Sequence, residues 1–570
     1  MKTLTDTEAR RWEYQLVAIA GGCVVFAVLA VTVFPAALAG SAAAIPVAAI
    51  LTVMTVLFAS TALAVLGAAA LHHAWFFSPR QRLRRDLGGP EGWVDSLDLR
   101  ESCGQQAVVA EAERFWRRRD LSPSQAGWVI GQPISGRWPV RARLLRAPYP
   151  RSAVVVGPQG SGKSQYIVPL ILDLPGAAVV TSTKAELFVA AAPARAELGE
   201  VYVFDPQNKT GGAHNFPFDP VIGCENAQLA DLTAEAMIRG AAISKRMSEE
   251  FWADAGREIL RCYLLAAALS ECGSYEVQRW THNPDDPEPL TILRRYEHKV
   301  PHGWLSLLEV RLNTNVRQRD GYFGTVSSCM DYLGHPGGAH ACDQARRAQF
   351  TMEGFLAERC TLFLIGDKSE RGMASMMTAL TEQLAYRARQ VRDGLVEPLA
   401  MILDEVANLT PVDLPKWTTE FRGHGVMPVA VIQSRAQLDK TWGPDDGQII
   451  WDNLVTKVIL PALGDEEFLE GLSRLAGERK VRRTSDTTRG GGQGSIGLER
   501  VIPLHVIRSL PPFHAFMIGI PRHPAVVAYE PGYRRLERDR TGQPWRPAWP
   551  RWWRHPLRAA ASAFTPVGRR

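Results

Sequence analysis

The most constraining feature of the sequence is a glycine-rich loop inside residues 152–170, which read SAVVVGPQGSGKSQYIVPL. The β-branched run 153–156 favours a buried strand, and the apolar residues after Lys163 favour a helix. Between them, GPQGSGKS fits the phosphate-binding pattern GxxxxGK[ST]. A chance match in a glycine-rich loop is the alternative, but a strand and a helix in the right order disfavour it. The stretch therefore predicts a P-loop nucleotide-binding domain.

Each residue type in this loop has a physical role. Glycines let the backbone N–H groups surround the phosphates, while Lys163 would reach the β- and γ-phosphates and the Ser164 hydroxyl would ligate Mg²⁺. The predicted nucleotide-binding residues are Gly157, Pro158, Gln159, Gly160, Ser161, Gly162, Lys163 and Ser164.

A second acidic motif is predicted in PLAMILDEVANL, where an apolar strand over 399–403 ends in Asp404 and Glu405. At the carboxyl end of a strand beside the loop, Asp404 would hold the metal and its water shell, and Glu405 would polarise an attacking water. A surface turn with two acidic residues is the alternative. No Asn-Lys-x-Asp guanine motif is evident, so ATP is favoured over GTP.

Two more residues are candidates for contact with the γ-phosphate. VMPVAVIQS reads as a strand that ends in Gln433, whose amide could sense the γ-phosphate or orient water. TTEFRGHG places Arg422 on a turn before that strand, where it could act in trans as an arginine finger. A strand-end glutamine and a solvated arginine are the plain alternatives.

The N-terminal region is strongly apolar, since no Asp, Glu, Lys or Arg lies between Tyr14 and Pro79. This length allows two membrane spans of about 20 residues each, which we place at 16–34 and 44–71. Basic residues flank both ends, so both flanks are expected inside, leaving a hairpin with a very short outer loop. A signal peptide is the alternative, but its apolar region would be shorter. The prediction is a membrane-anchored protein with both flanks of the hairpin and the nucleotide-binding domain in the cytoplasm.

The rest of the chain predicts an α/β fold. Its apolar runs are continuous rather than alternating, as in the buried strands of a parallel sheet. Some 240 residues separate the phosphate loop from Asp404, and strong helical patterns between them predict an inserted all-α domain. The predicted parts are a transmembrane hairpin at 1–80, a linker and start of the nucleotide-binding domain at 81–151, the nucleotide-binding domain at 152–225 and 359–530, the all-α domain at 226–358 and a basic tail at 531–570.

Composition limits the other function classes. The eight cysteines are scattered without metal-ligand spacing, which argues against a zinc site or a disulfide framework. The net charge is +6, but residues 532–570 hold ten arginines and two acidic residues, so the rest of the chain is near neutral. This tail also contains tryptophans and could touch phosphates or anionic lipid, although a disordered tail is the favoured interpretation.

Nine motifs, taken in order along the chain, resemble those of type IV coupling proteins, the TraG/TraD-like ATPases of conjugation and type IV secretion. They are GPQGSGKS, VVTSTKAEL, VYVFDPQN, HNFPFDPV, FWADAGREIL, TLFLIGDK, LDEVANL, GVMPVAVIQSRAQLDKTWG and LPPFHAFMIG. The resemblance implies a RecA-like motor that assembles as a ring, expected to be a hexamer. By position, Lys163 and Ser164 carry over as nucleotide and metal contacts, Asp404 and Glu405 as the acidic motif, Gln433 as the sensor and Arg422 as the finger.

The resemblance also implies partners. The all-α domain would meet DNA and relaxosome proteins, and the ring would pass a single-stranded DNA–relaxase complex or protein effectors to components of the secretion channel. One departure is TSTKAEL, which lacks the aspartate of the usual Asp-Pro-Lys-Gly-Glu-Leu stretch. The preferred hypothesis is a membrane-anchored ATPase that couples substrate to the channel. The alternatives are a double-stranded DNA translocase of the FtsK/HerA kind and a docking receptor that does not hydrolyse ATP.

Overall fold

The computed structural model describes Val53, Ser60 and residues 79–542, apart from 117–118, 138–139, 150, 245–249, 346–350, 368–371, 392–394, 396 and 486–492. The chain divides into two compact units, 1–86 with 548–570, and 87–547. Helix α3 (Pro79–Asp86) belongs to the first unit, and the elements discussed below belong to the second. Within the described part of the chain, no helix combines the length and the apolar character that a membrane crossing requires. Apart from Val53 and Ser60, the predicted spans lie outside the described residues.

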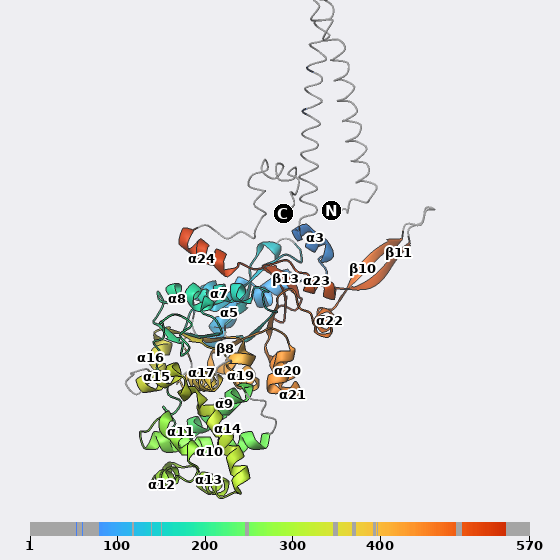
Figure 1. Cartoon of the computed structure of the whole chain (residues 1–570). Coiled ribbons are helices and arrows are strands. Elements are labelled where there is room, and N and C mark those ends of the chain that lie inside the picture. Colours follow the sequence, from blue (N-terminus) through green and yellow to red (C-terminus); the bar gives the residue numbers. More distant parts are fainter. Residues whose placement is uncertain are drawn as a thin grey trace, which may run out of the picture. The chain divides into compact units, whose positions relative to one another are not determined.

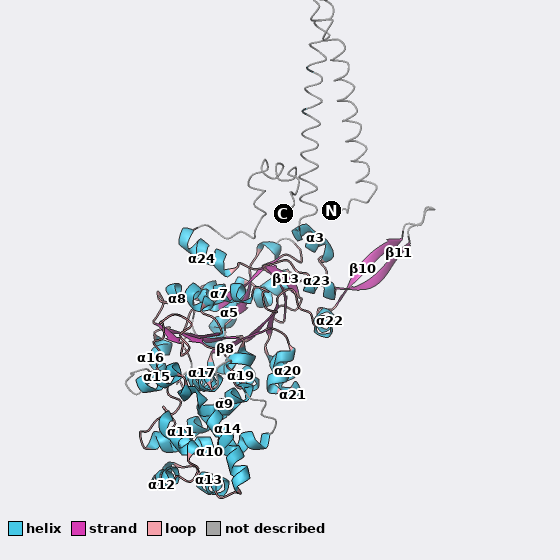
Figure 2. Ribbon diagram, in the orientation of Figure 1, coloured by secondary structure: helices cyan, strands magenta, loops and turns pink. Residues whose placement is uncertain are grey.

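An eleven-stranded sheet forms the centre of the second unit, in the order β2-β1-β13-β12-β9-β3-β8-β7-β4-β6-β5 (Figure 2). Its strands are β1 (Gly127–Pro133), β2 (Leu145–Pro148), β3 (Ala153–Val156), β4 (Ala178–Ser182), β5 (Val201–Phe204), β6 (Thr361–Ile365), β7 (Leu399–Asp404), β8 (Val426–Ile432), β9 (Thr456–Ile459), β12 (His514–Ile518) and β13 (Ala525–Ala528). A separate two-stranded sheet consists of β10 (Glu478–Ser485) and β11 (Gln493–Arg500).

The sheet is mixed, which corrects the prediction of a parallel sheet. The seven strands from β9 to β5 pair in parallel, and β3, β4, β6, β7 and β8 are buried along their whole length. On the other side of β9, the strands β12, β13, β1 and β2 add antiparallel to it and to one another. Short turns can join antiparallel strands, whereas parallel strands need crossover connections, so the short links within 127–148 and 514–528 suit this arrangement. The segment 81–151 thus contributes two strands to the sheet.

Helices cover both faces of the sheet, with α7 and α8 on one side and α17 and α19 on the other (Figures 1 and 2). The elements outside the insertion are α4 (Ser96–Asp98), the π-helical η1 (Leu99–Cys103), α5 (Gln105–Trp116), α6 (Pro123–Ala126), the 3-10 turn η2 (Val140–Ala142), α7 (Lys163–Asp173), α8 (Glu186–Arg195), α17 (Met373–Arg389), α18 (Val406–Leu409), α19 (Leu414–Glu420), the 3-10 turn η5 (Phe421–His424), α20 (Ala436–Trp442), α21 (Pro444–Asn453), α22 (Glu466–Leu475), α23 (Leu504–Arg508) and α24 (Gly532–Thr541).

The described residues of 226–358 are mostly helical, as their pattern predicts, whereas 205–225 after β5 form turns and irregular backbone. The helical part contains α9 (Ala227–Ser244), α10 (Glu250–Leu269), α11 (Ser274–His282), α12 (Glu288–Arg295), η3 (Glu297–Lys299), α13 (Trp304–Leu312), α14 (Val316–Met330), η4 (Asp331–Gly334), α15 (Pro336–Ala345) and α16 (Met352–Ala357). Helix α10 is central: its residues Ile259, Leu260, Tyr263 and Leu264 are buried, while Phe251 near its start is 48% exposed. Helix α9 packs on α17, so the insertion rests on the helical layer of the sheet.

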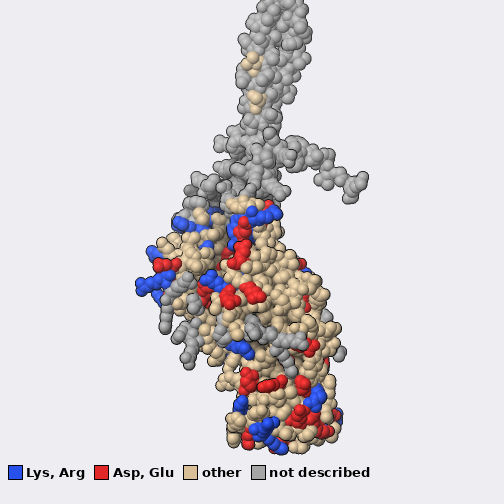
Figure 3. All heavy atoms as spheres, turned by 90° about the vertical axis from the view of Figure 1, so that its left-hand side faces the viewer, with Lys and Arg blue, Asp and Glu red and all other residues tan. Residues whose placement is uncertain are grey.

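The predicted C-terminal tail begins as a helix. Helix α24 packs on α7, where the Tyr533 backbone N–H donates a hydrogen bond to Gln165 Oε1 (3.0 Å) and Arg535 forms an ion pair with Asp173 (2.7 Å). Residues 543–570, with most of the tail arginines, lie outside the described part. On the face drawn in Figure 3, acidic and basic side chains of described residues are interspersed, as expected of a nearly neutral body.

Candidate functional site: a phosphate-loop pocket

The strand register brings the predicted motifs to one edge of the sheet. In the parallel pairing of β3 with β8, Val156 is opposite Ile432, and in that of β8 with β7, Val431 is opposite Asp404. The N–H of Gly157 continues the ladder by donating to the carbonyl of Ile432 (3.1 Å). The phosphate loop, Gln433 and the Asp404–Glu405 pair therefore follow the carboxyl ends of adjacent strands, the edge at which open α/β sheets bind ligands.

Two glycines give the loop its shape. Gly160 and Gly162 have φ angles of 81° and 95°, in the region that residues with a side chain rarely adopt. A Cβ atom on Gly162 would also lie 2.9 Å from the hydroxyl oxygen of Tyr529. Gly162 immediately precedes α7, so the loop runs into a helix N-terminus, whose free N–H groups and dipole favour an anion.

Lys163 is the first residue of α7 and points back over the loop. Its ammonium donates hydrogen bonds to the carbonyls of Gly157 (2.8 Å) and Pro158 (3.1 Å). Burial lowers the pKa of Lys163, whereas the nearby carboxylates of Glu405 and Asp404 raise it. The predicted lysine and the predicted acidic pair, which are 241 residues apart in the sequence, thus share one electrostatic environment.

Asp404 is buried at the end of β7, with 8% of the residue exposed. Its backbone carbonyl accepts a hydrogen bond from the Thr181 hydroxyl (3.0 Å), but its Oδ1 is buried and finds no partner among the described residues. Burial, and then repulsion from Glu405, raise the pKa of Asp404 to about 7, although Lys163 opposes this shift. A buried carboxylate oxygen without a partner fits a hard divalent cation such as Mg²⁺, which binds oxygen ligands. Ser164, the other predicted metal ligand, is half-buried at the start of α7.

Glu405 is held by two amides. Gln433 Nε2 donates to Glu405 Oε1 (2.6 Å) and Asn408 Nδ2 donates to Glu405 Oε2 (2.9 Å). Glu405 has a φ of 55°, an uncommon left-handed conformation that turns the chain from β7 into α18. Gln433 is fixed in turn, because its backbone N–H donates to Gln437 Oε1 (2.8 Å). Sequence reasoning missed Asn408 and Gln437; the signal for Asn408 was its place three residues after Glu405 in LDEVANL.

Arg422 lies elsewhere. It belongs to η5, which precedes β8 and so sits at the opposite edge of the sheet from Gln433. Its guanidinium forms an ion pair with Glu111 (2.9 Å), and 49% of its side chain is exposed. The structure therefore gathers Lys163, the acidic pair and Gln433 in one chain, but not Arg422.

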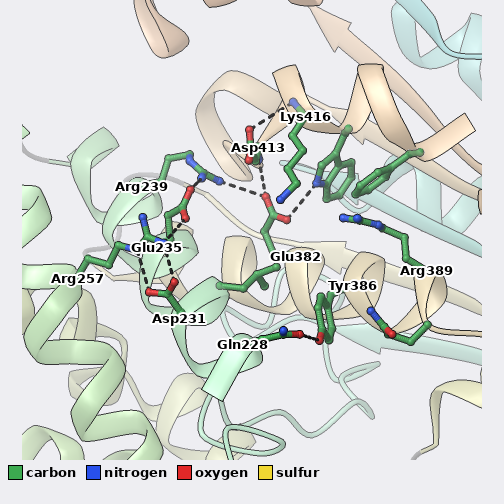
Figure 4. Close-up of a pocket in the computed structure, with 14 residues that line it drawn as sticks. Gln228, Asp231, Glu235, Arg239, Arg257, Glu382, Tyr386, Arg389, Asp413 and Lys416 are labelled. Carbon is green, nitrogen blue, oxygen red and sulfur yellow. Dashed lines mark hydrogen bonds and ion pairs between the residues drawn. The ribbon is translucent and has the colours of Figure 1, made fainter. Parts of the chain in front are cut away.

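The segment that follows the acidic pair reaches a second polar cluster, drawn in Figure 4, where α9, α17 and α19 meet around a cavity of about 370 Å³. Its centre is Glu382 of α17, which is 4% exposed. The Glu382 carboxylate accepts hydrogen bonds from Arg239 of α9 (3.2 Å), from the indole N–H of Trp417 of α19 (3.0 Å) and from the backbone N–H of Asp413. Burial raises the pKa of Glu382. One buried carboxylate thus ties the helical insertion to the segment after Glu405.

Comparisons with known proteins agree with this geometry. Residues 115–300 match the family model described as "Type IV secretory system Conjugative DNA transfer", and residues 398–512 match "TraM recognition site of TraD and TraG". Together these ranges contain the phosphate loop, the acidic pair and Gln433. Comparison with curated proteins gave no significant match.

Two solved structures share the fold. An unbound form of the bacterial conjugative coupling protein TrwBdeltaN70 aligns with a TM-score of 0.54 at 18% identity, over 74% of this chain and 91% of that chain. The plasmid coupling protein TrwB in complex with ADP and Mg²⁺ aligns with a TM-score of 0.53 at 18% identity, over the same shares. The motifs, their placement and the two family models lead to one assignment: this chain belongs to the TraG/TraD family of type IV coupling proteins.

Proposed function

We propose that this protein is a membrane-anchored ATPase that couples a relaxase–DNA complex or a protein substrate to a type IV secretion channel and helps to pump it. The observation that carries the proposal is the convergence of Lys163, Asp404 and Glu405 at one sheet edge, with an unpartnered Asp404 oxygen beside the loop. Membership of a conjugative DNA-transfer family supports the choice of substrate and channel. The complex of TrwB with ADP and Mg²⁺ supports these ligands for the same fold.

Each residue at the pocket has a task that follows from its surroundings. The Lys163 ammonium exchanges its two loop carbonyls for phosphate oxygens, and the loop N–H groups hold the remaining phosphates. Ser164 and Asp404 would hold Mg²⁺, which supplies charge neutralisation of the phosphates when bound. Glu405 accepts a proton from the attacking water, and Gln433 and Asn408 keep its carboxylate in one orientation. This constellation favours hydrolysis over a docking receptor that binds nucleotide without splitting it.

The membrane part of the proposal rests on the uncharged stretch 14–79. Two spans would hold the subunit on the cytoplasmic side of the bacterial inner membrane, with both termini inside. Subunits tethered in one plane would assemble as a ring, which we expect to be a hexamer. The helical insertion would then meet the relaxosome, and hydrolysis between subunits would move the substrate outward.

Replacing Lys163 by alanine tests the motor directly. We expect the variant to lose ATPase activity by about 100-fold or more, because a donor to the phosphates is removed. Transfer of DNA from donor cells should also fail, while the variant protein still sediments with membranes. The matched control is Lys440→Ala, since Lys440 is exposed on α20 away from the loop. Unchanged DNA transfer by the Lys163 variant would refute the motor hypothesis. Wild-type protein found in the soluble fraction would refute the proposed membrane anchoring.

A further inference from the structure

The two-stranded ribbon of β10 and β11 stands apart from the central sheet. Its strands pair antiparallel over eight positions, from Glu478 opposite Arg500 to Ser485 opposite Gln493, and bond to no other strand among the residues that the structure describes. Figures 1 and 2 show the ribbon extending away from the central sheet. An isolated pair of strands is marginally stable in water and usually needs a surface to pack against. The ribbon is therefore a candidate contact element.

One face of the ribbon combines apolar and basic residues. Ile496 and Leu498 are 72% and 64% exposed, among the most exposed large apolar side chains of the described chain. Residues directly opposite in an antiparallel pair share a face, and here Lys480 stands opposite Leu498. Lys480 is exposed as well. Two neighbouring apolar side chains exposed to this degree, next to the Lys480 cation, indicate a surface that is covered in the working protein.

The charge of the ribbon narrows the choice of partner. Its two strands contain five basic residues against two acidic ones, so the ribbon carries a net charge of +3. Basic residues beside a few exposed apolar ones are the composition with which peripheral segments bind an anionic lipid surface. Two ribbons from neighbouring copies would repel each other, and one face of two short strands is small beside the roughly 800 Å² per partner of a stable protein interface.

The base of the ribbon is tied to the chain that leads back to the predicted membrane spans. The Arg479 guanidinium donates hydrogen bonds to the carbonyls of Leu87 (2.7 Å) and Gly89 (3.1 Å). Leu87 is 16 residues beyond Leu71, the predicted end of the second span. Eight of these residues form α3, which is about 12 Å long, and the other eight reach at most about 29 Å when extended. Eight strand residues add a length of roughly 27 Å. A ribbon held at Leu87 can therefore reach the bilayer into which its own subunit is anchored.

We propose that the ribbon face with Lys480, Ile496 and Leu498 docks on the anionic cytoplasmic leaflet beside the subunit's own spans. This inference rests on the proposed membrane anchoring. The apolar side chains enter the headgroup region, and the cations meet lipid phosphates. Such a contact fixes the ATPase domain at a second point, in addition to the spans.

The test uses the full chain in lipid nanodiscs with an environment-sensitive fluorophore attached at Ile496→Cys. In discs that contain phosphatidylglycerol, we expect a blue-shifted emission and quenching by nitroxide-labelled headgroups. Both effects should be much weaker in discs of phosphatidylcholine alone. The matched control is Val310→Cys, because Val310 on α13 is 63% exposed but belongs to the helical insertion. Unmutated protein gives the background from the native cysteines. Adding Lys480→Glu to the labelled protein should remove most of the quenching.

The outcomes separate the two proposals. An incorporated chain whose probe at position 496 remains unquenched overturns the ribbon contact and leaves the anchor in place. A blue shift that persists in detergent at concentrations where the chain oligomerises assigns the face to a second copy and also overturns the inference. A chain that enters no disc overturns the anchoring, and with it the ribbon contact.

Discussion

Replacing Lys457 by methionine tests how much stability the folded protein loses to a buried charge beside the strand that precedes the phosphate loop. Lys457 lies in β9, opposite Val154 of β3, and is 9% exposed. Its ammonium donates a hydrogen bond to the carbonyl of Leu454 (2.9 Å) and lies 5.1 Å from the centroid of the Trp451 ring. Methionine keeps the apolar stem and removes both the charge and the hydrogen bond to Leu454.

The pKa of Lys457 gives the magnitude. Burial lowers this pKa from 10.5 to about 8, although Asp452 opposes the shift. Because one pKa unit corresponds to about 1.4 kcal/mol, charge on Lys457 costs the folded state about 3 kcal/mol at pH 7. Losing the hydrogen bond to Leu454 costs about 1 kcal/mol, so we expect the variant to be about 2 kcal/mol more stable at pH 7. The unfolded chain binds more protons between pH 8 and 10.5, so the stability contributed by Lys457 in the wild type rises with pH through that window.

Thermal unfolding of the full chain in detergent measures both effects. For a unit of this size, 1 kcal/mol shifts Tm by roughly 1–2 °C, so the variant should melt about 2–4 °C higher at pH 7. The advantage should shrink between pH 8 and 10.5 and then reverse to a deficit of about 1 kcal/mol, because the neutral amine of the wild type can still donate its hydrogen bond to Leu454. Lys440→Met, on exposed α20, should show no such dependence. A constant Tm difference across this pH range, or a less stable variant at pH 7, would refute the reasoning.

Two further substitutions probe the pocket and the junction below it. Gln433→Ala frees one oxygen of Glu405 while Asn408 still holds the other. Steady-state kinetics should therefore show kcat reduced by about 10- to 100-fold with little change in KM for ATP. A raised KM at unchanged kcat would contradict the positioning role of Gln433. Glu382→Gln keeps the shape of the side chain, but an amide nitrogen replaces one of the two oxygens that together accept three hydrogen bonds. A donor then faces a donor, so chemical unfolding should show a loss of about 1–3 kcal/mol at neutral pH. Burial raises the pKa of Glu382, so the stability that this group contributes is complete below its ordinary pKa and is lost as pH rises through the folded-state pKa. On acidification, the wild type should therefore become more stable relative to the variant. A stability difference that does not depend on pH would exclude this pKa shift.

The parallel half of the sheet could be predicted because its strands are continuous apolar runs. In the antiparallel half, HAFMI and AVVA also read as strands, but β1 and β2 could not be predicted, since GWVIGQP and LRAP contain Gly, Gln, Arg and Pro, which local patterns do not assign to strands. These segments become strands because β1 pairs with β13 on one side and with β2 on the other, and this pairing satisfies their backbone groups. Tertiary pairing, and not propensity, decided their structure.

The pocket shows the same division between local and long-range information. The loop motif and the acidic pair are recognisable in the sequence because each needs fixed residue types within a few positions. The amides that hold Glu405 are different, since the contact from Gln433 depends on the register of β7 against β8 and the contact from Asn408 on the left-handed turn at Glu405. The place of Asn408 three residues after Glu405 is visible in the sequence, but no spacing rule gives the register or the turn, so its contact with Glu405 is established only in the folded chain.

The position of Arg422 bears on how the site is completed. Arg422 precedes the first residue of β8 and Gln433 follows the last, and the seven residues between those ends span roughly 23 Å. An arginine side chain cannot bridge that length, so Arg422 cannot reach the phosphates bound by its own chain. The guanidinium is half-exposed and paired with Glu111, and an ion pair of this kind contributes only about 0.2–1 kcal/mol, so a competing anion can displace it. A finger role for Arg422 therefore requires a neighbouring copy whose pocket faces this edge of the sheet, as in the proposed ring, and an isolated subunit would lack that cation.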